Sequence, residues 1–344
     1  MSPTRLTLLL FAGTVGFACH DPPNEHEEFC ASDVVFRILF EVQDSEVDAD
    51  LDAVARSGRT TAALTVDGRL AVADADGVLR YIDAQPAARL RHLAIAPAPC
   101  KPAHVCETAA LLAVGDGGAA WRSVDGGRTY AALDLGITAD LRHVEFVLPL
   151  VSPEPQVGIG FIVGDGVLLR STDEGASWQP VALAAADAGS LHAVEGIDDW
   201  AYAVGDAGLV LESHDYGVTW TRLAHPFTDD LRRVHTDHHE ALAIVTADGA
   251  VLLKDDAGAL VRHEPQTPLV DVVPILDEGL LAAYADGRLG PWPESSGVAE
   301  AIELPALPRV LSPANSLLTV AGAGGSLAAV WTEDRKFACE AQPY

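Results

Sequence analysis

Apolar residues recur along the chain in a short unit, Leu-x-x-Val or Leu-x-x-Leu, that is repeated seven times. Successive units begin 38 to 51 residues apart, with further apolar stretches and polar turns between them. A period of this length is typical of β-propeller blades, each made of four strands. The units begin at Leu51, Leu90, Leu141, Leu191, Leu231, Leu269 and Leu307.

Glycines mark the turns between apolar stretches at regular places in each repeat. In the first five repeats a second glycine follows the first after nine residues, so the strand and hairpin between them keep one length. A repeated β-hairpin requires such a constant offset. The first glycines are Gly68, Gly118, Gly166, Gly208, Gly249, Gly287 and Gly325, and the second ones are Gly77, Gly127, Gly175, Gly217 and Gly258.

The two landmarks predict an all-β chain that folds as a seven-bladed β-propeller of four-stranded antiparallel blades. No segment keeps a 3.6-residue apolar period, so little helix is expected. We expect the propeller to occupy residues 34–344. The apolar run 34–42 precedes the first repeat, and we expect it to pair beside the last blade near residues 336–340 and so join the two chain ends.

A polar turn motif, Ser-x-Asp-x-Gly-x-Ser/Thr followed by an aromatic residue, closes a hairpin in three repeats, and a weaker copy spans residues 254–259. Its side chains can satisfy turn amides, and its glycine supplies a positive φ. The motif resembles the Asp-box, or bacterial neuraminidase repeat, which is a structural hairpin in many β-propellers. Its residues include Ser123, Asp125, Gly127, Ser171, Asp173, Gly175, Trp178, Ser213, Asp215, Gly217 and Trp220.

The repeats as a whole, for example residues 191–220, resemble the photosystem II assembly and stability factors and their non-photosynthetic bacterial relatives. The resemblance covers residues 51–340 and is clearest from the second to the fourth repeat. It implies a non-enzymatic scaffold that binds another protein or a ligand at the cell envelope. No cofactor is expected.

The chain carries 50 acidic and 22 basic residues, which gives a formal net charge of −28. Nucleic-acid affinity depends mainly on neutralising phosphates with Lys and Arg. The excess of carboxylates therefore argues against a nucleic-acid partner, and it also argues against direct binding to anionic lipid head groups.

Basic residues nevertheless occupy one or both middle positions of the Leu-x-x-Val unit in four consecutive repeats, and we name this set the basic arc. If the unit is the innermost strand of its blade, the basic arc lies near the mouth of a central channel. Two interpretations are open: the side chains pair with nearby carboxylates, or they bind a protein, an acidic peptide or another anionic ligand. The assembly factors carry basic residues near the axis, and the resemblance extends to Arg91, Arg142 and Arg232. The full arc is Arg91, His92, Arg142, His143, His192, Arg232 and Arg233.

Residues 1–18 have the pattern of a signal peptide, with Arg5 before an apolar run that is too short to span a bilayer. Residues 16–19 resemble a bacterial lipoprotein cleavage site, although leucine is usual where Gly16 stands. Lipidation of Cys19 and ordinary cleavage nearby both remain open. An acidic linker, residues 19–33, then leads to the propeller. We expect a monomer that is attached to the membrane only through such a lipid, or is periplasmic or secreted.

Four cysteines remain if Cys19 carries lipid, and an even number in an oxidising compartment suggests disulfides. Cys100 and Cys106 flank a short loop, whereas Cys30 and Cys339 lie at the two ends of the folded region. We expect these two bridges, and four free buried thiols are the alternative.

Residues 235–240, His-Thr-Asp-His-His-Glu, offer metal ligands at alternate positions of a strand, but no partner ligand is evident elsewhere in the sequence. A solvated loop is the preferred interpretation. The acidic turns at residues 48–50 and 74–77 lack the ligand series of a calcium loop. We therefore predict no metal site.

A glycoside hydrolase of the sialidase type is the alternative function, because such enzymes also carry Asp-boxes. Sialidases have Phe-Arg-Ile-Pro before the first box, whereas residues 36–39 read Phe-Arg-Ile-Leu and are expected on the closing strand. Paired carboxylates remain open as a catalytic device, but the sequence has no nucleophile elbow and no phosphate-binding loop. A purely structural envelope protein is the third class.

Overall fold

The computed structural model describes residues 35–43, 45–57, 60–73, 78–83, 85–96, 110–147, 158–237, 241–275, 279–292, 302–303, 308–314, 317–322 and 327–335. Within these ranges the regular structure consists of β-strands and two 3-10 turns, η1 (Asp116–Gly118) and η2 (Asp206–Gly208), without an α-helix. Neither turn is long or apolar enough to cross a membrane. The expected scarcity of helix is confirmed for this part of the chain.

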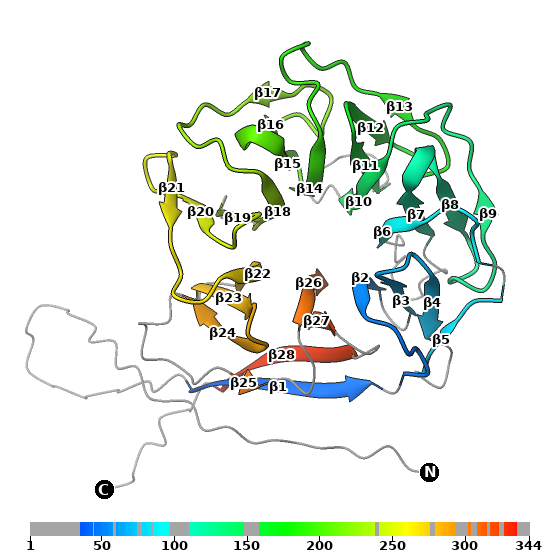
Figure 1. The fold of residues 1–344 in the computed structure, drawn as a ribbon, viewed down its shortest axis with the longest axis horizontal. Coiled ribbons are helices and arrows are strands. Elements are labelled where there is room, and N and C mark those ends of the chain that lie inside the picture. Colours follow the sequence, from blue (N-terminus) through cyan, green and yellow to red (C-terminus); the bar gives the residue numbers. More distant parts are fainter. Residues whose placement is uncertain are drawn as a thin grey trace, which may run out of the picture.

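Six sheets follow one another along the chain, each built from four consecutive antiparallel strands with the first strand nearest the centre of the ring (Figure 1). The first holds β2 (Leu51–Ser57), β3 (Thr60–Thr65), β4 (Leu70–Ala73) and β5 (Leu79–Tyr81), and the second β6 (Leu90–Ile95), β7 (Leu111–Gly115), β8 (Ala120–Ser123) and β9 (Ala131–Ala132). The third holds β10 (Leu141–Val147), β11 (Ile159–Gly164), β12 (Val167–Ser171) and β13 (Gln179–Pro180), and the fourth β14 (Leu191–Ile197), β15 (Trp200–Gly205), β16 (Val210–Ser213) and β17 (Thr221–Arg222). The fifth holds β18 (Leu231–Thr236), β19 (Leu242–Thr246), β20 (Val251–Lys254) and β21 (Leu260–His263), and the sixth β22 (Leu269–Ile275), β23 (Gly279–Tyr284), β24 (Arg288–Trp292) and β25 (Ile302–Glu303).

The remaining four-stranded sheet is composite, because both ends of the described chain contribute to it. From the centre outward it holds β26 (Pro308–Ala314), β27 (Leu317–Gly322), β28 (Leu327–Arg335) and β1 (Val35–Gln43). β1 and β28 pair antiparallel along nine residues, from Val35 opposite Arg335 to Gln43 opposite Leu327. This pairing covers the edge that β28 would otherwise expose and closes the ring.

The prediction of seven like blades therefore needs correction. Six blades are self-contained units of consecutive strands, and the last repeat supplies only three strands, so it is not a blade by itself. The N-terminal run does pair beside this repeat, but with residues 327–335 and not near residues 336–340. The repeat pattern missed this because β1 carries none of the leucine or glycine landmarks.

Every innermost strand has the same irregularity at its start, and this irregularity explains the Leu-x-x-Val unit. The pairing register shifts between the first and third residues, for example between Leu141 and His143, as in a β-bulge. The leucine and the fourth residue, such as Leu141 and Val144, are buried between sheets. The two middle residues are partly exposed in β6, β10 and β18, so they are placed at the axis of the ring.

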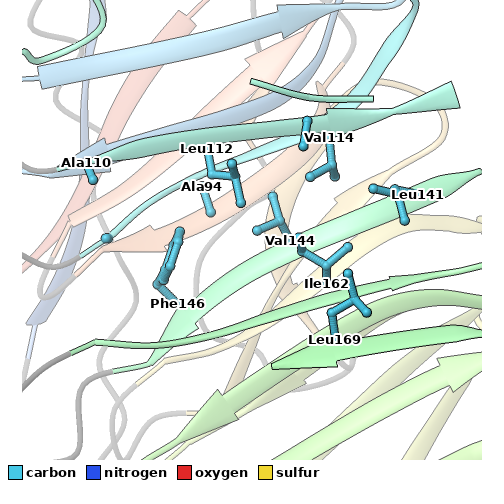
Figure 2. Packing of buried hydrophobic residues seen from close by; sticks show 11 residues of the cluster. Ala94, Ala110, Leu112, Val114, Leu141, Val144, Phe146, Ile162 and Leu169 are labelled. Carbon is cyan, nitrogen blue, oxygen red and sulfur yellow. The ribbon is translucent and has the colours of Figure 1, made fainter. Parts of the chain in front are cut away.

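The core lies between neighbouring sheets. In one cluster, Leu112 and Val114 from the second sheet pack against the third sheet, which contributes Val144 and Phe146 of β10 and Ile162 of β11 (Figure 2). Burying each such aliphatic side chain contributes on the order of 2 kcal/mol. The same leucines and valines that define the repeat therefore hold the blades side by side.

Candidate functional site: the inner strands around the axis

The Asp-box turns lie at the periphery, between the third and fourth strands of the second, third and fourth sheets. In the first box, the backbone N–H of Gly127 donates to Ser123 Oγ at 2.9 Å, and Ser123 Oγ–H donates to Asp125 Oδ1 at 2.8 Å. Although burial acts in the opposite direction, hydrogen bonds from Thr129 help to lower the pKa of Asp125 to about 2. The second and third boxes repeat these bonds.

Each of the last two Asp-boxes also receives an arginine from the preceding blade, a contact that the sequence did not suggest. Arg122 Nη2–H donates to the carbonyl of Glu174 at 3.2 Å, and Arg170 Nε–H donates to the carbonyl of Tyr216 at 2.7 Å. In both cases the arginine directly precedes the serine of its own box. These boxes therefore connect neighbouring blades, far from the axis.

The basic arc begins with three arginines at the second position of inner strands, and each of them contacts a carboxylate. Arg91 pairs with Asp116 and lies 3.6 Å from Asp140, measured from Nη2 to Oδ2. Arg142 Nε–H donates to Asp165 Oδ1 at 2.8 Å, and this bond raises the pKa of Arg142 and lowers that of Asp165.

The third arginine and a histidine share carboxylates at the next two blades. His192 Nε2 lies 2.5 Å from Asp206 Oδ1, and burial lowers the pKa of His192 against the opposing effect of this contact. Arg232 lies 3.4 Å from Asp206 Oδ1 and 3.3 Å from Asp230 Oδ2. The four second-position residues thus form one arc of contacts with carboxylates where the inner strands begin, and the three arginines among them form ion pairs. We call this side of the ring the entry face.

The carboxylates of the entry face are as exposed as the basic groups that they contact, or more so. The side chains of Asp140, Asp206 and Asp230 are 38%, 44% and 47% exposed, whereas those of Arg91 and Arg232 are 28% and 40% exposed. A partner at this face therefore meets fixed charges of both signs. The arginines are held in place because their guanidinium groups are already hydrogen-bonded.

The third-position residues of the arc lie one level deeper along the axis. The rings of His92 and His143 stack with their centroids 3.6 Å apart and an interplanar angle of 24°. His92 Nδ1 lies 3.1 Å from the carbonyl oxygen of Val144. Burial, together with Arg233, lowers the pKa of His92 to about 3 and that of His143 well below its ordinary value.

A third level, two residues further along the inner strands, was missed by the sequence reasoning. His235 of β18 lies between two carboxylates, with Nδ1 2.8 Å from Glu195 Oε2 and Nε2 2.9 Å from Asp271 Oδ1. Burial alone would lower the pKa of His235, but Glu195 and Asp271 raise it to about 10. Burial, with Glu195 as the second cause, raises the pKa of Glu145 to about 8. The sequence signal that could have found this level is strand alternation, because the third and fifth residues of each inner strand lie on the same face.

Of the possible metal ligands at residues 235–240, the structure describes only His235 and Asp237, and these two side chains have separate partners. His235 contacts Glu195 and Asp271, whereas Asp237 Oδ1 accepts from the backbone N–H of Ala241 at 3.0 Å. His239 lies outside the described residues. Across the part of the chain that the structure describes, no three His, Cys, Asp or Glu side chains are grouped to hold a metal ion.

Several predicted features lie outside the described residues: Cys19, the disulfide candidates Cys30, Cys100, Cys106 and Cys339, and the acidic turn 74–77. In the other acidic turn, Asp48 accepts a hydrogen bond from Tyr81 Oη at 2.9 Å. Arg37 lies on β1, the outermost strand of the composite sheet. It therefore lies on the strand of that sheet farthest from the axis, as expected for a closing strand.

Comparison with known proteins agrees with the repeat pattern. Residues 128–265 match the family described as photosynthesis system II assembly factor YCF48. The protein is an Asp-box β-propeller that resembles this assembly factor. No curated protein matches the chain.

Solved structures with the same fold belong to proteins of several activities. "YCF48 bound to D1 peptide" is 13% identical with a TM-score of 0.63, covering 86% of this chain and 97% of its own. YCF48 from Cyanidioschyzon merolae is 13% identical with a TM-score of 0.58, covering 84% and 98%. A catalytically inactive virginiamycin B lyase from Staphylococcus aureus is 10% identical with a TM-score of 0.65, covering 86% and 99%. At these identities the likeness establishes the fold alone.

Proposed function

We propose that this protein is a non-enzymatic scaffold that binds a segment of another protein at its entry face. The observation that carries the proposal is the arc of fixed ion pairs at the starts of β6, β10 and β18, together with the His192–Asp206 contact at the start of β14. Four successive blades present charged groups side by side. A charged side chain of a partner can therefore take the place of one member of such a pair. The resemblance to YCF48, one structure of which is described as bound to a peptide, supports the same mode of use.

The binding test uses charge reversal at the entry face. We would apply the mature domain to an array of acidic, neutral and basic peptides and compare wild type with the Arg142→Glu, Arg232→Glu double variant. Peptides that bind the wild type should lose at least tenfold in affinity. The control is Arg222→Glu, because Arg222 lies on the outermost strand β17. Equal binding by all three proteins would remove the entry face from the proposal.

We further propose that the chain is exported through residues 1–18 and resides at the cell envelope as a monomer, with a lipid on Cys19 or with ordinary cleavage nearby. The proposal is supported by the charged and apolar pattern of this segment. Intact mass of the purified mature protein, with and without reductant, reports lipidation and the number of disulfides together. A mass equal to that of the uncleaved chain would contradict export.

Glycoside hydrolysis is kept as a second candidate because of one observation. Glu145 and Glu195 come from neighbouring inner strands, and Glu195 contributes to the raised pKa of Glu145, about 8. A protonated acid beside a second carboxylate is the arrangement that glycosidases use. Turnover of chromogenic glycosides that is abolished by Glu145→Gln would favour this candidate over the scaffold.

A further inference from the structure

His192 differs from the arginines of the entry face because one of its ring nitrogens contacts two groups of opposite charge. Its Nε2 lies 2.5 Å from Asp206 Oδ1 and 2.5 Å from Arg232 Nη1. Asp206 follows β15 in the same blade as His192, whereas Arg232 belongs to β18, the inner strand of the next blade (Figure 1). The side chain of His192 is only 10% exposed. Two neighbouring blades therefore meet at a single, nearly buried nitrogen atom.

One imidazole nitrogen cannot serve both of these partners in the same protonation state. Without a proton, Nε2 is an acceptor and suits an N–H of Arg232, whereas with a proton it is a donor and suits the carboxylate of Asp206. The guanidinium of Arg232 stays charged at every physiological pH, so an imidazolium beside it is repelled. The protonation state of His192 therefore decides which of the two contacts is kept.

The surroundings of His192 favour its neutral form. Burial lowers its pKa, the hydrogen bond to Asp206 acts against burial, and the charges of Arg232 and Arg142 act with it. Asp165 is a second carboxylate within electrostatic range of the ring, and it accepts a hydrogen bond from Arg142 at 2.8 Å. At neutral pH the bare Nε2 thus accepts from Arg232, and the ring takes up a proton only below its ordinary pKa of 6.5.

Arg232 is placed so that losing the imidazole changes its position. Its remaining contacts are long, with Nη2 3.3 Å from Asp230 Oδ2 and Nη1 3.4 Å from Asp206 Oδ1, and its side chain is 40% exposed. Arg142, in contrast, is bonded directly to Asp165 at 2.8 Å and is 27% exposed. A proton on Nε2 therefore loosens Arg232 without breaking the bond of Arg142.

We propose that His192 is a pH switch of the entry face: when neutral it holds Arg232, and when protonated it pairs with Asp206 and releases Arg232. The inference rests on the proposed function, because it states how binding at the same face is regulated. The imidazolium adds one positive charge, and the released guanidinium becomes available to a partner. An acidic partner segment should therefore bind more tightly below the titration midpoint of His192.

The first test follows the side-chain NMR signals of His192, Arg232 and Arg142 between pH 7.5 and 5, a window above the ordinary aspartate pKa of about 4. We expect the guanidinium signals of Arg232 to change and its rotation to speed up with the midpoint of His192, while those of Arg142 stay constant. His192→Gln can still accept from Arg232 but cannot titrate, so it should abolish the change. The matched control is His214→Gln, which removes a histidine near Glu212 in a peripheral Asp-box. The switch is refuted if Arg232 does not follow His192, or if His192 does not titrate above pH 5.

A second test connects the switch to binding. A capped peptide of three aspartates is titrated into wild type and His192→Gln at pH 7.5 and at pH 5, and the comparison of the two proteins cancels the titration of the peptide itself. Relative to the variant, the wild type should gain about threefold in affinity at pH 5, the effect of one additional exposed ion pair. Equal gains in both proteins would refute control of the entry face by His192. If Arg232 is released but no peptide binds at either pH, the scaffold function fails and the switch stands.

Discussion

At the scale of single residues, the most consequential group is His235, because it joins three inner strands by its two ring nitrogens. Its partners, Glu195 of β14 and Asp271 of β22, belong to the preceding and following blades. Asp271 is fully buried, and its Oδ1 also accepts from the backbone N–H of Val272 at 3.0 Å. A charge in this position depends on its partner, since no solvent can replace the imidazolium.

We predict that His235→Gln lowers the free energy of unfolding by about 3–5 kcal/mol, because it leaves two carboxylates without their cation. Urea denaturation at pH 7 measures the change. Adding Asp271→Asn to His235→Gln should recover part of the loss, since the second change removes the unpaired charge. A loss below about 1 kcal/mol for the single variant would show that the bridge is not important for stability.

Glu145 gives the pH dependence of stability a defined direction. Its pKa in the folded protein, about 8, is above its ordinary value of 4.5, so the folded state holds a proton that the unfolded chain has released. Stability therefore falls as the pH rises from about 5 through 8. The Glu145→Gln variant has no titrating group at this position. We therefore expect the free energy of unfolding of the variant, relative to that of the wild type, to increase by more than about 1 kcal/mol between pH 5 and pH 8.

Chemical denaturation of both proteins at pH 5, 6, 7 and 8 checks this prediction. The titration of His235, whose pKa is raised to about 10, removes stability as the pH rises toward that value in both proteins and cancels in the comparison. A difference that is independent of pH would show that Glu145 titrates normally.

At the scale of elements, the Asp-box hairpin shows how one turn serves two blades. Its serine and aspartate satisfy the turn amides, as the bond from the Gly217 N–H to Ser213 Oγ in the third box illustrates. Gly217 has φ +76°, and a Cβ there would lie 2.1 Å from Cε1 of Phe161, which belongs to β11 of the preceding blade. The glycine is therefore required both for its backbone conformation and for the close contact between blades.

We predict that Gly217→Ala destabilises the protein more than Gly136→Ala does. Gly136 has φ +65°, and a Cβ added there would meet no atom within 4 Å, so alanine carries only the backbone penalty of about 1 kcal/mol. Gly217→Ala adds a clash with Phe161, and we expect a total loss of about 3 kcal/mol. Thermal and urea unfolding of the two variants isolate the contact, and equal losses would mean that Phe161 moves aside without cost.

At the scale of the whole molecule, the composite sheet decides whether the ring is closed. β1 is the outermost strand of this sheet and is paired along its whole length with β28. Without β1, the edge of β28 presents unpaired backbone groups. The first and last described strands are thus joined although they are almost 300 residues apart in the sequence.

We predict that deleting residues 1–43, which removes β1, lowers the unfolding midpoint and promotes association through the exposed edge of β28. Deleting residues 1–33 is the matched control, because it leaves β1 in place. Circular dichroism melts and size-exclusion chromatography compare the two proteins. Closure by β1 would be unimportant if both melted at the same temperature and eluted as monomers.

The sequence by itself determined the periodicity, the hairpins and the Asp-box turns, because these depend on residues that are close together in the chain. Leu141 and Val144, Gly127 and Asp125 could be assigned from local chemistry alone. The tertiary structure alone decided that the last repeat borrows β1 and that Arg91 and Arg142 pair with aspartates. The ion pairs of Glu195, His235 and Asp271 join residues about 40 positions apart. Such contacts depend on how neighbouring blades pack around the axis, and no local pattern encodes that arrangement.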